Sequence, residues 1–414
     1  MNQPTLPYEA ALRVVLDAST PSAVEPCPVK ACLGRSLAAP VISAVELPPF
    51  DNSAMDGFAL RGNAIVAAGT ELDIEGEQAA GDGMASARAG AWEIMTGARV
   101  PDGLDRVIPV EQTERLSATR IRLLADTASG QNVRRAGSDV AQGAAVLSAG
   151  TVLQPQHLML LAALGVASVP VSGRPRVAVI CTGRELVDDP AQPLAPGQIR
   201  NSNGPFLAAR LPLAGAEVVH VETVGDDAAA FEAALRCALA AGARLIVTSG
   251  AVSMGRYDFV PQALARLGAQ TLFHKVAIRP GKPLLFARLA DGALLFGLPG
   301  NPMAVAVGLR FFVEPALRVM LRLPAETPFR APLGHPFSKK PPLRFHLKSR
   351  LTMDAQGRLA VEVLDGQESY RIAPLSEANA WAVVPADVDA LPAGALVDIY
   401  GASHLEFPLP ECVA

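Results

Sequence analysis

Residues Thr248 to Val260 combine small, hydroxyl and acidic residues in a way that suits phosphate chemistry. The apolar run Leu245 to Val247 before this stretch is typical of a buried strand, and the segment Phe259 to Leu267 at its end has helical spacing. A loop between a strand and a helix presents backbone N–H groups at the start of the helix, where a phosphate group can bind. The alternative is a tight turn that binds no ligand.

Three further loops are expected beside this one. Short apolar runs alternate with helical patterns in this half of the chain, which predicts a parallel sheet with right-handed crossovers. The expected strands are 177–181, 217–221, 244–248 and 293–297, and the expected helices are 204–213, 228–240, 259–267 and 302–320. Ligands bind at the carboxyl ends of such strands, and the loops that leave those ends are 182–185, 224–227, 249–258 and 298–302.

These loops would bring the carboxylates of Glu185, Asp226 and Asp258 to one rim of the sheet. Acids beside a phosphate cradle indicate a Mg²⁺ site, because Mg²⁺ binds one or two carboxylates together with phosphate oxygens. Alternatively, the acids only cap helices, a role worth about 1 kcal/mol each, and Asp226 or Asp227 would suit the helix 228–240. We favour the metal site because capping requires no such density of Gly and Ser.

Basic residues cluster in the segment 273–283, which contains Lys275, Arg279 and Lys282. Three cations close together and stiffened by a Pro-Gly pair suit an anionic substrate. The alternative is a solvated face, which is the usual place for Lys and Arg.

The composition excludes several classes of protein. With 36 basic and 40 acidic residues the net charge is −4, which leaves no electrostatic footprint for nucleic acid. The longest apolar region, Leu158 to Val171, is too short to span a membrane and is broken by Ser168 and Pro170. The five cysteines form no Cys-x-x-Cys pair and the first residues do not resemble a signal peptide, so we expect a reduced, cytoplasmic protein.

The 414 residues are too many for one core, and the sequence pattern changes along the chain. Short strands and Gly-rich turns in 46–147 predict a β-rich domain, inserted into a small, partly helical N-terminal domain of residues 1–45 and 148–172. Residues 173–323 form the α/β domain, and residues 324–414 alternate like the strands of a small β-barrel. The expected fold class is therefore multidomain α/β plus β, with a doubly wound parallel-sheet domain.

Five motifs in this order resemble the molybdopterin molybdenumtransferase family, the MoeA type that includes the E-domain of gephyrin and of its plant counterpart. The motifs span nearly the whole chain, and together they are far more specific than any one alone. They are FDNSAMDGFA at 50–59, MTGARVP at 95–101, IRNSN at 199–203, the stretch 248–258 and LPGNP at 298–302.

The resemblance implies an enzyme of molybdenum cofactor biosynthesis. Such enzymes insert molybdenum from molybdate into molybdopterin, take adenylylated molybdopterin as substrate, release AMP and use Mg²⁺. They are elongated homodimers with four domains per chain, the third of which is MogA-like. Their cleft lies between the third domain of one chain and the second domain of the other, with help from the fourth. The molybdopterin adenylyltransferase and the molybdoenzymes that receive the cofactor are candidate partners.

The resemblance also implies site residues in three domains. The catalytic residues would be Asp56, Thr96 and Asp139 from the second domain and Glu185, Asp226 and Asp258 from the third, where the last three also bind the metal. The cations of the segment 273–283 would hold molybdate or the pterin phosphate, and the glycines would let backbone N–H groups approach the nucleotide phosphate. The substrate-binding residues would be Ser249, Gly250, Ser253, Gly255, Lys275, Arg279, Lys282, Pro299, Gly300, Asn301 and Pro302, with Lys348 and Ser369 from the fourth domain.

Some positions depart from the family pattern. Ala251 stands where a second Gly is frequent, Arg184 where an acid or Asn is frequent, and Ser138 where Glu is frequent. Arg279 replaces a frequent Lys and keeps the charge, whereas Lys348 replaces an Arg and loses its bidentate geometry. The acids on which the assignment rests are all present.

Two other functions fit part of the pattern. A scaffold that binds the pterin without turnover would not need the complete set of acids. The adenylylation reaction itself is run by single-domain relatives, which lack the other three domains. The sequence therefore favours the transferase.

Overall fold

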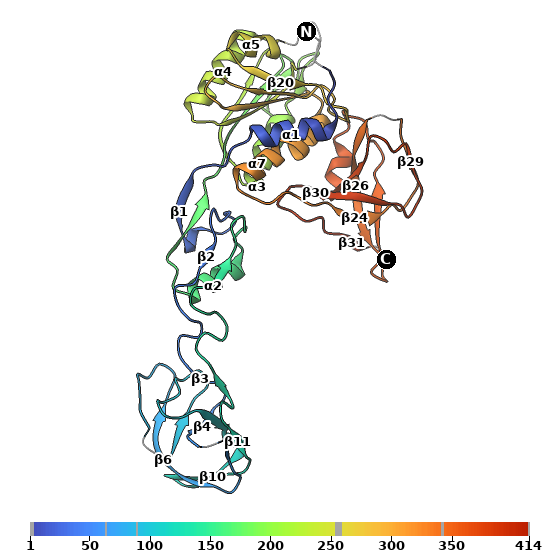
Figure 1. Cartoon of the computed structure of the whole chain (residues 1–414). Coiled ribbons are helices and arrows are strands. Elements are labelled where there is room, and N and C mark those ends of the chain that lie inside the picture. The colour runs from blue at the N-terminus through green and yellow to red at the C-terminus, as the bar shows by residue number, and fades with distance from the viewer. Residues whose placement is uncertain (1–3, 63, 88–89, 253–258, 341–342, 413–414) are drawn as a thin grey trace.

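The computed structural model describes residues 4–62, 64–87, 90–252, 259–340 and 343–412. The molecule is elongated, with a β-rich part at one end and the α/β and C-terminal parts together at the other (Figure 1). A small part between them contains β1 (Val24–Pro28), β14 (Ser168–Ser172) and α2 (Pro155–Ala163). Because β1 pairs antiparallel with β14, the chain passes through this small part once on its way to the β-rich part and once on its way back.

The β-rich part is built on a six-stranded sheet whose core contains Phe58, Leu60 and Ile108. A Cβ at Gly57 would lie 1.9 Å from the carbonyl oxygen of Ile108 on the neighbouring strand, so Gly is required where the strand of Gly57 pairs with the strand of Ile108. The strand order is β8 (Arg106–Pro109), β4 (Gly57–Leu60), β7 (Ala91–Ile94), β6 (Glu71–Gln78), β10 (Arg120–Leu123) and β9 (Thr113–Ser117). Shorter pairs are β2 (Val41–Ile42) with β13 (Ala145–Leu147), β3 (Asn52–Ser53) with β12 (Val133–Arg134), and β5 (Ile65–Val66) with β11 (Thr127–Ala128).

The α/β part contains a second six-stranded sheet. Its parallel strands lie in the order β18 (Glu217–Val224), β15 (Arg176–Thr182), β19 (Leu245–Ser249) and β23 (Leu294–Leu298). The four strands predicted from the sequence are therefore parallel, and the next strand, β22 (Leu285–Arg288), was not predicted and pairs antiparallel with β23. Only a short turn at Gly292 joins these two strands, and such a connection requires them to be antiparallel. β20 (Gln270–His274) completes the sheet beside β22.

Helices cover both faces of this sheet, as a doubly wound fold requires. One face packs against α4 (Ala228–Ala240) and α5 (Val260–Arg266). The other packs against α3 (Asn203–Leu213), α6 (Pro302–Gly308) and α7 (Glu314–Met320). The predicted closing helix 302–320 is interrupted by a π-helical turn at Leu309–Val313, which joins α6 to α7.

The first helix, α1 (Tyr8–Ala18), also packs on the α/β part. We expected residues 1–45 in the small N-terminal domain, but Tyr8, Ala11 and Val15 belong to the core beneath α7. Their spacing places them on one side of the helix, and this apolar face is buried against the α/β part. The prediction that this helix belongs to the small domain was therefore wrong, because the helix packs on the α/β part.

The C-terminal part is a seven-stranded sheet around a core of its own. β21 (Ile278–Arg279) belongs to the basic segment predicted at 273–283, and it pairs parallel with the long strand β26 (Arg344–Met353). The basic segment therefore links the α/β and C-terminal parts. The other strands are β28 (Ala380–Val384), β30 (Leu396–Gly401), β24 (Phe329–Pro332), β27 (Leu359–Val363) and β31 (Glu411–Cys412), with a separate pair of β25 (Phe337–Ser338) and β29 (Ala390–Leu391).

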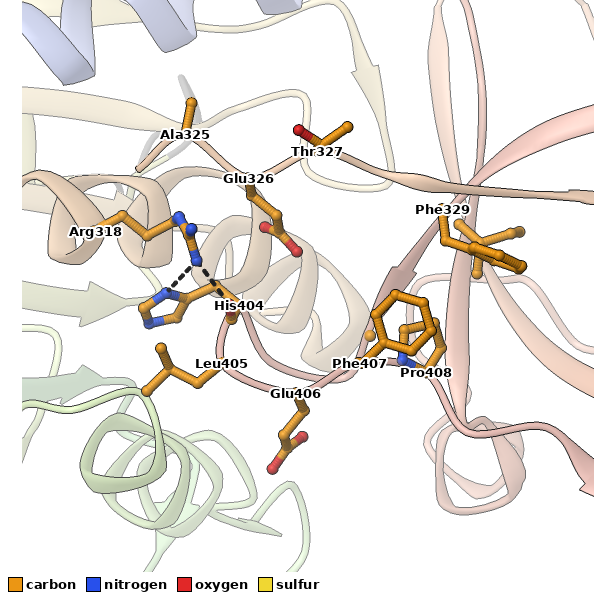
Figure 2. A pocket seen from close by; sticks show the side chains of 12 residues that line it. Arg318, Ala325, Glu326, Thr327, Phe329, His404, Leu405, Glu406, Phe407 and Pro408 are labelled. Atoms are coloured by element: carbon orange, nitrogen blue, oxygen red, sulfur yellow. Dashed lines mark hydrogen bonds between the residues drawn. The ribbon is translucent and has the colours of Figure 1, made fainter. Parts of the chain in front are cut away.

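Buried charges fix the junction between the α/β and C-terminal parts, beside a hollow of about 300 Å³ (Figure 2). Arg318 of α7 donates from Nη1 to the carbonyl oxygen of His404 at 2.7 Å and to its Nδ1 at 3.4 Å. Arg310 pairs with Glu326 at 2.9 Å. Glu314 accepts a hydrogen bond from the backbone N–H of His404 at 2.8 Å, and burial raises its pKa to about 7.

Candidate active site

The loops at the carboxyl ends of the parallel strands meet, as the sequence predicts. The backbone N–H of Gly250 donates to the carbonyl oxygen of Leu298 at 3.0 Å, which joins the loops after β19 and β23. The N–H of Gly183 donates to the carbonyl oxygen of Val224 at 3.0 Å, which joins the loops after β15 and β18. The Thr182 hydroxyl donates to the carbonyl oxygen of Ser249 at 3.2 Å and connects the two pairs of loops. All four loops therefore lie at one edge of the sheet.

Gly250 is the point of closest approach between these loops. Its φ is 94°, and a Cβ at this position would lie 2.4 Å from the carbonyl oxygen of Thr182. A Cβ at Gly300 would meet nothing closer than the Cα of Gly250, at 3.7 Å. Backbone rather than side chains thus lines this part of the site, which suits close contact with an oxyanion.

The acids Glu185 and Asp226 lie on the two adjacent loops. The Glu185 carboxylate folds over Gly183, where an added Cβ would lie 2.7 Å from Glu185 Oε1. Asp227 caps α4 by accepting from the N–H groups of Ala229 and Ala230 at 3.2 and 3.1 Å. The capping alternative therefore accounts for Asp227 and not for the exposed Asp226. Asp258, Ser253 and Gly255 lie outside the described residues.

The donor chemistry of this rim fits a Mg²⁺ ion. Glu185 and Asp226 are two carboxylates on neighbouring loops, and the ion takes one or two of these together with phosphate oxygens. Within the described parts of the chain, no three His, Cys, Asp or Glu side chains gather closely enough to hold a metal ion by themselves.

The predicted cations lie at the seam between the α/β and C-terminal parts. Lys275 adopts a φ of 96°, and its N–H donates to the carbonyl oxygen of Leu284 at 2.9 Å. The Arg279 guanidinium lies 5.3 Å from the ring centroid of Phe345, and Lys282 is exposed. Arg279 also lines a hollow of about 920 Å³ that reaches the C-terminal loop at Glu368.

The C-terminal part brings Ser369 to the site but not the side chain of Lys348. The carbonyl oxygen of Ser369 accepts from the N–H of Met303 at 3.0 Å, so this loop lies beside the turn of Pro299, Gly300, Asn301 and Pro302. Lys348 is 1% exposed and donates from Nζ to the carbonyl oxygens of Gly366 and Arg371 at 2.6 and 3.0 Å. Burial lowers its pKa. We expected Lys348 to hold an anion, but in the structure it shapes the loop that carries Ser369.

The predicted residues of the β-rich part lie beside its strands: Asp56 between β3 and β4, Thr96 after β7, and Asp139 after β12. This part lies at the end of the molecule opposite the α/β part (Figure 1). The N–H of Thr96 donates to Asp56 Oδ1 at 2.6 Å, and this hydrogen bond lowers the pKa of Asp56. Asp139 is exposed, and its N–H donates to the carbonyl oxygen of Leu47 at 2.9 Å. Within one chain, these residues do not join the loops of the α/β part.

Three side chains that the sequence did not single out tie the site together. Asn201, Asp188 and Thr223 form a hydrogen-bonded network between β15, β18 and α3. Asn201 follows β17 (Ile199–Arg200), which pairs with β16 (Leu186–Val187) just after Glu185. The IRNSN motif was the available signal, because amide side chains before a helix bind backbone groups.

Comparison with known proteins decides the family. Residues 6–165 match the MoeA N-terminal region (domain I and II), residues 178–319 a probable molybdopterin binding domain, and residues 330–401 the MoeA C-terminal region (domain IV). The molybdopterin molybdenumtransferase of Synechococcus elongatus is 40% identical over 404 residues, which cover 95% of this chain and 99% of that protein. The chain belongs to the molybdopterin molybdenumtransferase family.

Other members of the family agree in sequence and in fold. The molybdopterin molybdenumtransferase of Bacillus subtilis is 33% identical over 407 residues, covering 95% of this chain and 93% of the relative. The crystal structure of the molybdopterin biosynthesis moeA protein from Pyrococcus horikoshii superposes with a TM-score of 0.81 at 27% identity, covering 96% of this chain and 99% of that one.

The predicted family, the multidomain fold class and the class of enzyme, a transferase of molybdenum cofactor biosynthesis, are confirmed. In the described residues, none of the helices has the length and apolar character needed to cross a membrane.

Proposed function

We propose that this chain inserts molybdenum from molybdate into adenylylated molybdopterin and releases AMP, in a reaction that requires Mg²⁺. The observation that carries the proposal is the meeting of four loops at the carboxyl edge of the parallel sheet, where Gly250 allows the loops to approach closely and Gly300 is exposed on the same edge as Glu185 and Asp226. Family membership supports the same reaction class.

Each group on this rim has a distinct role in the proposal. The absence of a side chain at Gly250 lets backbone N–H groups of its loop approach oxygens of the nucleotide phosphate. Glu185, Asp226 and Asp258 hold Mg²⁺, which when bound neutralises charge on the phosphate oxygens. Lys275, Arg279 and Lys282 hold molybdate or the pterin phosphate, because cations close together suit an anion. Ser369 closes the rim from the C-terminal part.

The proposed cleft requires a second copy of the chain. Asp56, Thr96 and Asp139 lie far from the α/β loops of their own chain, and the elongated shape would let a partner bring them there (Figure 1). We therefore propose a homodimer with two composite clefts, acting in the cytoplasm. The adenylyltransferase that makes the substrate and the molybdoenzymes that take the product are its proposed partners.

The proposed domain division is 1–45 with 148–172, 46–147, 173–323 and 324–414. The two strand crossings at β1 and β14 support the inserted position of the β-rich domain. α1 is excepted from this division, because it packs on the α/β part rather than in the small domain.

A reconstituted reaction tests the function. The purified protein, supplied with adenylylated molybdopterin, molybdate and Mg²⁺, should release AMP and yield cofactor that activates an apo-molybdoenzyme. Asp258→Asn should abolish both products and retain the fold by circular dichroism, because only a charge is removed. A wild-type protein that binds the nucleotide and leaves it intact would instead be a scaffold.

A further inference from the structure

The side chain of Asn201 lies where the loops that carry Glu185 and Asp226 meet, and it is 8% exposed. Its Oδ1 accepts from the backbone N–H of Gly204 at 3.0 Å. Its Nδ2 donates to Asp188 Oδ1 at 2.9 Å and to Thr223 Oγ1 at 3.0 Å. The Thr223 hydroxyl also donates to Asp188 Oδ1, at 3.2 Å, and closes the network.

Each partner of Asn201 is close in sequence to part of the site. Asp188 follows β16, the strand directly after Glu185. Thr223 lies near the end of β18, just before the loop that carries Asp226. The N–H of Ile199 donates to the carbonyl oxygen of Glu185 at 2.8 Å, which ties the Glu185 loop to the segment of Asn201 a second time.

The neighbouring Asn203 extends this connection to a third loop. Its Nδ2 donates to the carbonyl oxygen of Gly300 at 2.8 Å. The start of α3 therefore holds the loop after β23 as well as those after β15 and β18. The IRNSN motif is thus the segment on which these loops converge.

Only a primary amide satisfies the contacts at position 201. The site needs two donors and one acceptor on a single planar group, which Asn supplies and Asp or Ser does not. The space also requires a Gly at 204, because a Cβ there would lie 2.8 Å from Asn201 Nδ2 and 3.3 Å from Cys181 Sγ. Reversing the amide would place donors against the Gly204 N–H, so its orientation is fixed.

We propose that Asn201 is a positioning residue that sets the separation of the Glu185 and Asp226 loops and thereby the affinity of the site for Mg²⁺. The role given to the two acids rests on the proposed function. Asn201 itself does not touch the metal or the phosphate in this proposal; it acts by holding Asp188 and Thr223 in register.

Two variants and a matched control test the proposal in the full-length protein. Asn201→Ala removes all three contacts, and Asn201→Asp keeps the shape but removes both donors and adds a charge beside Asp188. Asn379 is the control, because its amide also makes three hydrogen bonds, to the backbone of Leu351 and Leu409, in the C-terminal part. Asn379→Ala removes a similar number of contacts away from the site.

Two measurements are made on each protein: hydrogen–deuterium exchange of the segments 183–188, 199–206 and 222–228, and the Mg²⁺ concentration for half-maximal AMP release. Both Asn201 variants should exchange faster in these segments and need about tenfold more Mg²⁺ or more, whereas Asn379→Ala should match the wild type in both. Asn201→Asp should recover in part at acidic pH, because a protonated carboxyl donates one hydrogen bond again.

Wild-type exchange and wild-type Mg²⁺ dependence in the Asn201 variants would overturn the proposal. Faster exchange without a change in Mg²⁺ dependence would also overturn it, because the network would then hold the loops without setting the metal site. If Asn201→Ala does not fold, Thr223→Val removes the two hydrogen bonds of the Thr223 hydroxyl, keeps the other contacts of Asn201, and should shift both measurements in the same direction. A wild-type protein that releases no AMP would refute the proposed function. The exchange data would still show whether Asn201 holds the Glu185 and Asp226 loops.

Discussion

Gly250 places a strict limit on the side chain that this loop can accept. An added Cβ would overlap the carbonyl oxygen of Thr182, and the φ of 94° is strained for any other residue. We expect Gly250→Ala to lower the free energy of unfolding by more than about 1 kcal/mol and to abolish AMP release. Urea unfolding and the reconstituted assay measure the two effects.

Gly300→Ala is the matched control for this substitution. Its nearest neighbour would be 3.7 Å away, and its φ is not in the left-handed region. This variant should unfold at the wild-type urea concentration. Equal loss of stability in both variants would show that the loops are not packed as described.

The residue types of the site could be predicted from the sequence better than their environments. Glu185 and Asp226 follow strand ends, and strand ends meet in a parallel sheet, so their proximity was predictable. The burial of Lys348 was not, because the carbonyl oxygens it binds come from a loop whose path depends on the tertiary fold. The network around Asn201 was missed for the same reason, since its partners are distant in sequence.

At the scale of elements, the start of α4 carries one acid that caps the helix, Asp227, and one that we propose binds the metal, Asp226. Asp227 accepts two hydrogen bonds from the first turn, and Asp226 beside it makes neither. Asp227→Ala should cost about 1 kcal/mol of stability and leave most of the activity. Asp226→Ala should keep the stability and lose activity by about a hundredfold or more.

Thermal unfolding and AMP release of the two variants measure this difference. If Asp226→Ala is as destabilised as Asp227→Ala, or keeps wild-type activity, its assignment to the metal site is wrong.

The strand and helix positions in the α/β part were largely predictable, because alternating apolar runs and helical spacing are local signals. β22 was not predicted, and its antiparallel direction follows from the short turn at Gly292 rather than from the strand itself. The packing of α1 was also missed. An apolar helix face shows that a helix is buried, but it does not show against which part of the chain.

At the scale of the whole molecule, His404 makes the stability of the junction between the α/β and C-terminal parts depend on pH. Burial lowers the pKa of His404 from 6.5 to about 3, and its Nε2 lies 3.0 Å from the carbonyl oxygen of Ala214. Because the unfolded chain binds a proton at His404 more readily than the folded chain does, unfolding becomes easier in acid. The contribution of the neutral His404 to stability is complete above pH 6.5 and is lost as the pH falls towards 3.

His404→Gln should therefore flatten the loss of stability in acid. The difference between wild type and variant should change by up to about 1.4 kcal/mol per pH unit below 6.5, in the direction that favours the variant as pH falls. Urea unfolding followed by tryptophan fluorescence measures this slope, because Trp381 of β28 is buried in the core that the C-terminal part shares with the α/β part. Parallel curves for the two proteins would contradict the coupling.

The separation of the two halves of the proposed site is the main argument for a dimer. Asp56 and Thr96 are preorganised by their hydrogen bond, yet the loops around Gly250 lie at the other end of the chain. A purified protein that sediments as a monomer under assay conditions would leave these groups without a common substrate.

The most direct test combines two variants that are defective in different domains. Asp56→Asn and Asp226→Asn should each fail to release AMP as homodimers, because every cleft then lacks one of the two carboxylates. Heterodimers purified through two different tags contain one intact cleft, made of the unaltered domains of both chains. We predict that they release AMP at about half the wild-type rate. Heterodimers as inactive as either parent would contradict a cleft shared between two chains.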